Sequence, residues 1–309
     1  MNAKHAYLII AHHQFELLEL LCRCLDHPLH DIYIHLDAKV KSFDYDGLQG
    51  KMQYSDVHFL SERVNVSWGG YSQIQSELAL FRAATPGEYE YYHIVSGIDL
   101  PLRTAQEIYD FFHERRGQEF IHYSSVAYCG SGGALDRVKY YHLLQEKVGH
   151  SSGVLKFLER CIVRLQKIAG IDRLANVEEV IKCGANWVSI SHDLAMHILK
   201  REQWIKKVFR WSGCADEVFV QTIAWNSPFR EKLYYANDTG DYHSCMRYVD
   251  WGRGKPYTFR SEDFDDLISS DFMFARKFDY CADPRLCEKL AQWVLDRSKN
   301  EETITHSCK

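Results

Sequence analysis

Short apolar runs alternate with longer segments of helical spacing over the first part of the chain. Residues 15–25, 72–84 and 104–115 carry apolar side chains three or four positions apart, which predicts helices with one buried face. Alternating strands and helices predict an α/β fold, in which helices cover both faces of a mostly parallel central sheet. The apolar runs between the helices predict buried strands at 7–11, 32–36, 57–60 and 91–95.

Polar residues follow three of these strands, at the sheet edge where parallel sheets bind ligands. His12 follows the first strand, Asp37 the second, and Asp99 lies in the turn after the fourth. This arrangement favours a nucleotide-binding half over residues 1–125. Neither GxGxxG nor GxxxxGK[ST] occurs, which weakens the dinucleotide and P-loop interpretations. Asp37 could instead simply end a strand, and Asp99 could only organise its turn.

Residues 126–180 predict a helical insertion, and 153–169 form its most distinctive part. Leu155, Leu158 and Leu165 share one helical face there, while lysine and arginine occupy other positions. The pattern favours an ordinary helix packed on the core. The alternative is peripheral contact with a membrane surface that carries a lipid-linked substrate.

The composition favours one compact domain, 1–309, in which the remaining residues 181–309 form a catalytic and acceptor-binding half. Of 309 residues 46% are hydrophobic, which is ample for a sizeable core, and 6 prolines leave little room for a linker. The net charge of −5 argues against a nucleic-acid binder.

The sequence predicts a cytoplasmic protein, with peripheral attachment at the inner face of the membrane as the alternative. The N-terminal apolar run is too short for a signal peptide, and no run reaches the length of a membrane span. The 10 cysteines include no pair of CxxC motifs that would indicate a zinc knuckle. We therefore expect reduced and mostly buried thiols.

Two adjacent carboxylates, Asp216 and Glu217, stand at the start of an apolar segment. Acidic groups are favoured at a helix N-terminus, so one carboxylate could cap a helix there while the other points elsewhere. The apolar run 185–191 precedes them, and Arg260 and Lys277 occur downstream. A carboxylate base with remote cations would suit a reaction that expels a diphosphate.

Read in order, a set of short motifs resembles the core-2/I-branching β-1,6-N-acetylglucosaminyltransferases and the related peptide xylosyltransferases, glycosyltransferase family 14. The similarity covers about residues 7–278. The motifs are Ala11-His12-His13, His35–Lys39, Val66–Gly70, Ser96–Pro101, Gly184–Ser191, Ala215–Glu217 and Phe274–Phe278.

The resemblance implies a GT-A-like nucleotide-sugar fold and an inverting transferase that needs no metal or other cofactor. Glu217 matches the family's base and Asp37 its uridine contact, with His12 beside it in the nucleotide site. Arg260 and Lys277 match the pair that grips the diphosphate. Trp251 matches the aromatic residue near the acceptor. We add Asp99 and Trp187 as candidate sugar or acceptor contacts.

The chemistry required of Glu217 is removal of a proton from an acceptor hydroxyl during attack on the sugar. The departing diphosphate gains charge, which Arg260 and Lys277 would stabilise. We expect a UDP-sugar donor, UDP-GlcNAc first and UDP-xylose as the alternative, and a glycan or lipid-linked glycan acceptor.

Several of these assignments have alternative interpretations. Trp187 and Trp251 are more often core residues than sugar platforms, and Arg276 could point outward beside Lys277. A zinc hydrolase is disfavoured because HExxH is absent. A noncatalytic carbohydrate-binding protein remains a further alternative.

Overall fold

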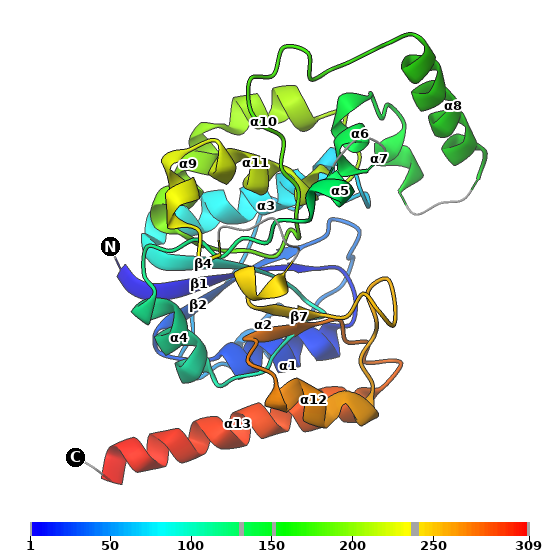
Figure 1. Ribbon diagram of the computed structural model, residues 1–309. Helices are drawn as coiled ribbons and strands as arrows, with labels where there is room; N and C mark the ends of the chain where they lie inside the picture. The colour runs from blue at the N-terminus through cyan, green and yellow to red at the C-terminus, as the bar shows by residue number, and fades with distance from the viewer. Residues whose placement is uncertain (1, 130–132, 150–152, 236–240, 308–309) are drawn as a thin grey trace.

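The computed structural model describes residues 2–129, 133–149, 153–235 and 241–307. A five-stranded sheet of order β3-β2-β1-β4-β6 forms its centre (Figure 1). β1 pairs in parallel with β2 and β4, β2 pairs in parallel with β3, and β6 is antiparallel to β4. The strands are β1 (Asn2–Ala11), β2 (His30–Leu36), β3 (Val57–Phe59), β4 (Tyr89–Ser96), β5 (Leu100–Pro101), β6 (Ser189–Ser191), β7 (Arg247–Val249) and β8 (Phe274–Arg276).

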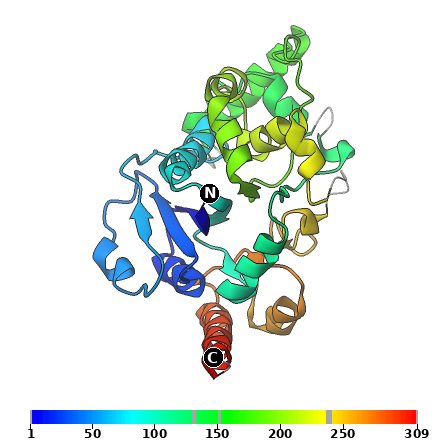
Figure 2. The same cartoon turned by 90° about the vertical axis from the view of Figure 1, so that its left-hand side faces the viewer.

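Helices cover both faces of this sheet, so the predicted α/β class with a mostly parallel sheet is confirmed (Figures 1 and 2). The helices are α1 (Phe15–Leu25), α2 (Tyr45–Gln49), α3 (Tyr71–Ala84), α4 (Ala105–Glu114), α5 (Val126–Cys129), α6 (Ala134–Lys139), α7 (Gln145–Val148), α8 (Val154–Ile168), α9 (His192–Lys200), α10 (Glu202–Phe209), α11 (Phe219–Trp225), α12 (Phe264–Ser269) and α13 (Pro284–Ser307).

The alternation of side chains along β1 divides the core into two layers. Leu8 packs in one cluster with Leu78 of α3, and Ile9 packs in the other with Leu21 of α1. Successive strand residues point to opposite faces, so a strand buried on both faces is apolar throughout. This explains why the uninterrupted apolar runs of the sequence predicted the central strands correctly.

The order of the strands reverses between β1 and β4. The chain adds β2 and then β3 on one side of β1, and returns to add β4 on the other. A ligand crevice forms at such a switch point, outside the carboxyl ends of the strands. His12, Asp37 and the loop that begins at Ser96 follow the three strands concerned.

A second, three-stranded sheet of order β5-β8-β7 lies beside this crevice. β8 pairs antiparallel to β5 and parallel to β7, so Ala275 stands opposite Leu100 and Tyr248. Its strands are two or three residues long, which is too short to show a hydrophobic period, and the sequence did not predict them. This small sheet brings Arg276, at the end of β8, to the loop after β4.

Helix α8 is present at nearly the predicted bounds, but the interpretation that its apolar face packs on the core is wrong. Its buried residues are Glu159 and Gln166. Phe157 and Leu165 are each 65% exposed, and Ile168 is 77% exposed. The helix therefore attaches to the protein by a polar face.

The expectation that the cysteines are all reduced is also wrong. Cys129 and Cys183 form a disulfide, with their Cα atoms 5.9 Å apart. The bond joins the end of α5 to the segment that leads into β6. The prediction failed because residues 54 positions apart in sequence are brought together only by the fold.

Among the described residues, none of the helices is both long enough and apolar enough to cross a membrane.

Candidate active site

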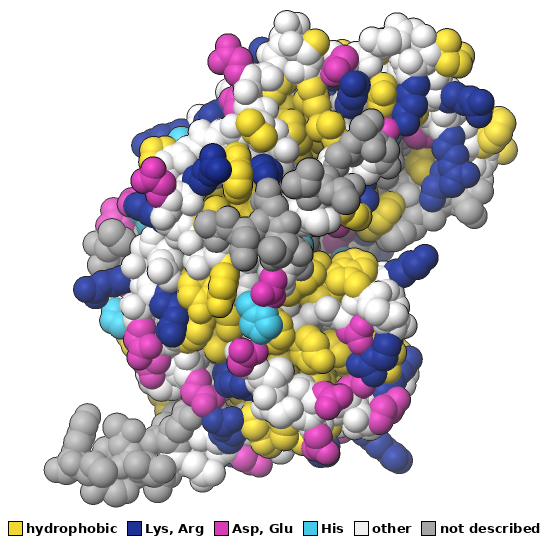
Figure 3. All heavy atoms as spheres, viewed as in Figure 1, with side chains coloured by type: hydrophobic (Ala, Val, Ile, Leu, Met, Phe, Trp, Pro, Cys, Tyr) yellow, Lys and Arg dark blue, Asp and Glu magenta, His cyan; other side chains and the backbone are white. Residues whose placement is uncertain are grey.

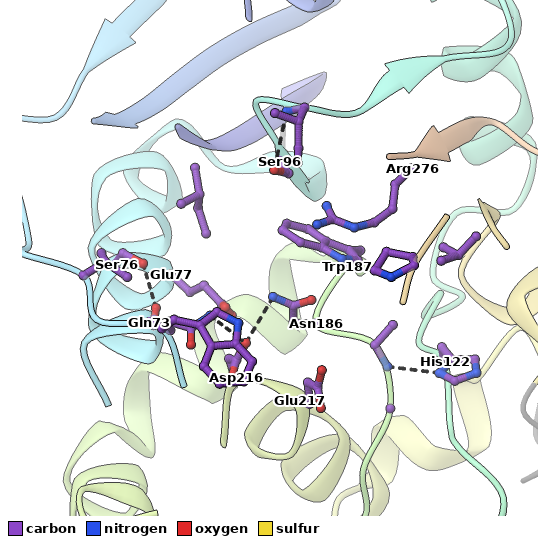
Figure 4. A pocket seen from close by; sticks show the side chains of 18 of the residues that line it. Gln73, Ser76, Glu77, Ser96, His122, Asn186, Trp187, Asp216, Glu217 and Arg276 are labelled. Carbon is purple, nitrogen blue, oxygen red and sulfur yellow. Dashed lines mark hydrogen bonds between the residues drawn. The ribbon is translucent and has the colours of Figure 1, made fainter. Parts of the chain in front are cut away.

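A cavity of about 930 Å³ opens at the switch point of the central sheet. His12, Asp37 and Ser96 line it from the ends of β1, β2 and β4. The opposite wall comes from α3, from the segment before β6 and from the Asp216–Glu217 turn (Figure 4). The sequence motifs that lie far apart along the chain thus meet around one space.

Five of the eight predicted site residues line this cavity: His12, Asp37, Trp187, Glu217 and Trp251. The other three, Asp99, Arg260 and Lys277, are outside its lining.

Asp216 and Glu217 occupy a turn of 3₁₀ helix, Ala215–Glu217, ahead of α11. The turn is entered through Cys214, whose backbone is left-handed with φ 49°. Neither carboxylate is the N-cap of a helix. The N-cap residues of the 3₁₀ turn and of α11 are Cys214 and Val218, and neither makes a side-chain capping hydrogen bond. The expectation that one of the two carboxylates caps a helix is therefore wrong, and the contacts of Asp216 fit a role in orienting its neighbours.

Asp216 is buried and points away from its neighbour (Figure 4). Its Oδ2 accepts hydrogen bonds from Gln73 Nε2 at 3.0 Å and Asn186 Nδ2 at 3.4 Å. Burial, and then the charge of Glu217, raises the pKa of Asp216 to about 7. This residue is better suited to organising the wall than to serving as an exposed base.

A second acid, Glu77 of α3, lines the same part of the cavity. Its side chain is 1% exposed, and neither carboxyl oxygen has a hydrogen-bond partner. Burial raises its pKa well above the ordinary value, and the nearby Asp216 raises it further. Its surroundings therefore favour the neutral form of the Glu77 carboxyl group.

Glu217 is the accessible acid of this group, with its side chain 36% exposed on the cavity wall. Its Oε2 accepts a hydrogen bond of 2.7 Å from Arg137 in α6. Arg137 also donates to the hydroxyl of Tyr128, another lining residue. This carboxylate is oriented by one cation while it remains open to the cavity, which is the geometry expected of a general base.

At the strand ends, Asp37 supplies a carboxylate and His12 an imidazole. Asp37 is buried and accepts a hydrogen bond from the backbone amide of Lys39 at 2.8 Å. Lys39 Nζ lies 3.4 Å from the other carboxylate oxygen. Burial lowers the pKa of His12, and the adjacent His13 lowers it further. Its surroundings therefore favour the neutral imidazole, which can both donate and accept a hydrogen bond.

Arg276 points into the cavity, so the interpretation that it faces solvent is wrong (Figure 4). Its guanidinium donates to Asp99 Oδ1 at 2.8 Å and stacks 4.2 Å above the ring of Trp187. Asp99 also accepts from the backbone amide of Ser96 at 2.9 Å. Asp99 therefore closes the turn and holds Arg276, which makes it a positioning residue instead of a sugar contact.

Arg260 and Lys277 lie on adjacent backbone segments, although neither lines the cavity. The amide of Phe259 donates to the carbonyl of Lys277, and Phe278 donates to the carbonyl of the cavity residue Ile98. The two cations predicted to act together are thus neighbours at the border of the site. The lining cations are Lys39, Lys147, Lys255 and Arg276.

Trp68, Trp187 and Trp251 all line the cavity. Trp187 also packs against the core, as expected, whereas the interpretation of Trp251 as a core residue is wrong. Trp68 is 46% exposed and Trp251 is 52% exposed. The indole of Trp251 donates to the Tyr242 hydroxyl at 2.7 Å. Open aromatic faces at a cavity wall are suited to stacking against a sugar or a base.

Several residues of the site were missed by sequence reasoning, but two carried a signal. Glu77 interrupts the apolar face of a predicted helix, next to Leu78, and an acid at such a position is unusual. Asn186 belongs to a motif that supported the resemblance. Arg137 carried no signal, because it lies 80 positions from Glu217 and its own surroundings are unremarkable in sequence.

In the part of the chain that the structure describes, no three histidine, cysteine, aspartate or glutamate residues are grouped so as to hold a metal ion.

Comparisons with known proteins support the family that the motifs indicate. The model of the Core-2/I-Branching enzyme family matches residues 5–269. Xylosyltransferase sqv-6 of Caenorhabditis briggsae is 25% identical over 88% of this chain and 34% of its own length. Xylosyltransferase 2 of Rattus norvegicus is 22% identical over 92% of this chain and 33% of its own length.

This chain therefore spans about a third of the length of the curated relatives it matches. Among solved structures, mouse xyloside xylosyltransferase 1 in its apo form has a TM-score of 0.37 and 13% identity, covering 87% of this chain and 96% of that one. The family match extends over most of the chain and includes nearly all of the central sheet. The chain belongs to the Core-2/I-Branching enzyme family of glycosyltransferases.

Proposed function

We propose that this protein transfers a sugar from a UDP-sugar to a hydroxyl group of a glycan, with inversion and with Glu217 as general base. The observation that carries the proposal is the contrast within the Asp216–Glu217 pair. Asp216 is 5% exposed and is hydrogen-bonded by two amides, whereas Glu217 is open to the cavity and ion-paired. A single accessible carboxylate suffices for direct displacement at the sugar carbon.

In this mechanism the acceptor hydroxyl approaches Glu217 Oε1, because Arg137 already donates to Oε2. The proton moves from the hydroxyl to the carboxylate as the oxygen attacks the anomeric carbon and the bond to the diphosphate breaks. Arg137 keeps the carboxylate in one orientation, which lowers the entropy cost of aligning the reacting groups. The products are the glycosylated acceptor, UDP and a protonated Glu217.

Fixed cations would stabilise the charge that develops on the departing diphosphate. Arg276 is positioned for this by Asp99 and Trp187, and Lys39 and Lys255 line the same cavity. Lys277 and Arg260, which the family resemblance implies, lie beside them on paired segments. We propose that these side chains replace a metal ion, so that no cofactor is required.

Two donors have comparable support. The family description names branching enzymes, which favours UDP-GlcNAc, whereas the relatives described above are named xylosyltransferases, which favours UDP-xylose. In either case Asp37 and His12 would contact the nucleotide. The acceptor is a glycan, free or lipid-linked.

A donor screen tests the proposal. The purified protein is incubated with UDP-GlcNAc, UDP-xylose and UDP-glucose and a mixture of glycan acceptors, and UDP release is measured with and without EDTA. We expect acceptor-dependent release from one of the first two donors, unchanged by EDTA. Donor binding without release in any combination would favour a noncatalytic carbohydrate-binding protein. Loss of activity with EDTA would remove metal independence.

A further inference from the structure

Helix α8 stands apart from the body of the protein and is attached to it in an unusual way (Figure 1). Gln166 exchanges two hydrogen bonds with the backbone of Tyr141, at 2.8 and 2.9 Å. Glu159 accepts from the amide of Leu144 at 2.9 Å. An amphipathic surface helix normally turns its apolar face inward, but α8 is held by polar contacts.

The apolar face of α8 is consequently open. Val154 is 74% exposed, Phe157 65%, Leu165 65% and Ile168 77%. At 100° per residue these four side chains fall within one arc of the helix, with Leu158 beside them. Contiguous exposed apolar patches of this kind mark a surface that binds something.

Basic side chains border this face. Lys156, Arg160, Arg164 and Lys167 occupy the arc next to it, and the only acid of the helix, Glu159, is turned inward. Figure 3 shows lysine and arginine side chains gathered at the edge of the molecule where Figure 1 places α8. The whole chain carries a net charge of −5, so this cationic helix is a local exception to its overall charge.

We infer that α8 lies in the interface of a lipid bilayer that contains anionic headgroups. A helix with an open apolar arc flanked by lysine and arginine matches the charge and depth of that interface. The apolar side chains would enter the acyl boundary while the cations remain among the headgroups. Among possible occupants, an anionic bilayer supplies both an apolar layer for the open face and a dense layer of negative headgroups for the adjoining cations.

The position of α8 connects this surface to the cavity. Helix α7 packs against α8, and Lys147 of α7 and the following Gly149 line the cavity. Gln145 of α7 donates to the carbonyl of Trp68 on the cavity wall at 3.0 Å. If the proposed transferase function is correct, a bilayer docked on α8 would present a lipid-linked acceptor near the side of the cavity that holds Trp68.

Vesicle flotation tests the inference with two matched variants. Leu165→Asp removes an exposed aliphatic side chain from the α8 face, and Val180→Asp makes the same change at a 56% exposed position outside the helix. The probes are vesicles of phosphatidylcholine alone and of phosphatidylcholine mixed equally with phosphatidylglycerol. Circular dichroism checks that both variants are folded.

We expect the protein and Val180→Asp to float with the anionic vesicles, and Leu165→Asp to lose at least about tenfold in partitioning. Lys156→Gln and Arg160→Gln should each reduce partitioning by up to about fivefold at low salt and by less at high salt. If Leu165→Asp fails to fold, Leu165→Ser at the same position replaces it.

Equal flotation of Leu165→Asp and Val180→Asp would overturn the inference, as would the absence of flotation with anionic vesicles. Sedimentation of a dimer that Leu165→Asp dissociates, without flotation, would assign the face to a second copy instead. UDP release with a soluble acceptor is measured in parallel. Flotation without release would contradict the proposed function alone, and release without flotation would contradict the membrane inference alone.

Discussion

At the scale of single residues, burial gives neighbouring acids different chemistry. Asp216 and Glu217 are adjacent in sequence, yet one is enclosed with Glu77 and the other faces the cavity. Desolvation favours the neutral form of a carboxyl group, so the two buried acids do not behave as ordinary exposed carboxylates. The exposed acid of the three is the one free to exchange a proton with a substrate.

The enclosed acids should make stability depend on pH in a definite direction. The pKa values of Glu77 and Asp216 are raised in the folded protein, that of Asp216 to about 7. Both groups therefore stabilise the folded state fully below about pH 4, and this stabilisation is lost as the pH rises toward their pKa values in the folded protein. We expect Asp216→Asn to become more stable relative to the unmodified protein between pH 5 and about pH 7.5. Thermal unfolding at both pH values measures this difference.

The matched control is Glu114→Gln, which removes the charge of a side chain that is 70% exposed. Its melting temperature relative to the unmodified protein should not depend on pH over the same range. A pH-independent difference for Asp216→Asn as well would show that Asp216 is ionised in the folded protein.

Arg276 should contribute to nucleotide binding through a charge-assisted contact. We expect Arg276→Ala to weaken UDP binding by about tenfold or more, since such contacts contribute roughly 1.5–3 kcal/mol. Asp99→Asn should act in the same direction more weakly, because it removes only the group that positions the guanidinium. Isothermal titration with UDP measures both.

Arg285→Ala is the control, because Arg285 is an exposed arginine outside the cavity lining. Its affinity for UDP should be unchanged. If Arg276→Ala also binds UDP normally, the diphosphate is held elsewhere, and Arg260 and Lys277 become the residues to examine.

At the scale of elements, the sequence predicted strands β1 to β4 and helices α1, α3, α4 and α8, but it did not predict β7, β8 or the longest helix, α13. α1 was predicted at its observed bounds because its apolar spacing is regular from Phe15 to Leu25. β7 and β8 have three residues each and exist through pairing with one another. The run 185–191 is strand only at its end, over β6, because the preceding residues turn into the cavity wall.

A disulfide links two elements beside the cavity, α5 and the segment before β6. Tyr128 and Gly184, next to its two cysteines, both line the cavity. Closing a loop of 54 positions stabilises a fold by at most about 4 kcal/mol in the chain-entropy view. We expect Cys129→Ser with Cys183→Ser to lower the melting temperature by several degrees and to weaken UDP binding.

Peptide mapping under non-reducing conditions tests the pairing directly, and should recover a peptide that contains both cysteines. The control is Cys281→Ser, at an exposed free cysteine, which should melt normally. Recovery of both cysteines as free thiols in the native protein would contradict the assignment.

At the scale of the whole molecule, the site could be predicted only in part, because it is assembled from distant segments. Residues at strand ends, such as His12 and Asp37, follow from the sheet topology. The Arg137–Glu217 and Arg276–Asp99 pairs join positions 80 and 177 apart, and nothing local indicates them. A single charged residue in the sequence does not reveal its role when its partner lies far along the chain.

The core beneath the sheet also contains ionisable groups, and these act on stability in the opposite sense to the buried acids. Burial lowers the pKa of His30 and of His93. The nearby His5 lowers both pKa values further, because a positive charge on its ring repels a second one. Groups with depressed pKa values favour the folded state above about pH 6.5 and lose that contribution as the pH falls. We expect His93→Asn to be less destabilised, relative to the unmodified protein, at pH 5.5 than at pH 7.5.

Urea unfolding at the two pH values measures this change. His58→Asn, at an exposed histidine, should show no such dependence on pH. An equal difference at both pH values for His93→Asn would show that His93 binds protons alike in the folded and unfolded chains.

The most direct test of the account is the behaviour of Glu217→Gln, which keeps the size of the side chain and its contact with Arg137 but cannot accept the proton. A general base contributes about 10²–10⁴ in rate. We predict that UDP release with the productive donor and acceptor falls by roughly this factor, while the affinity for UDP changes less than about twofold. Release at the rate of the unmodified protein would contradict the assignment of Glu217 as the base.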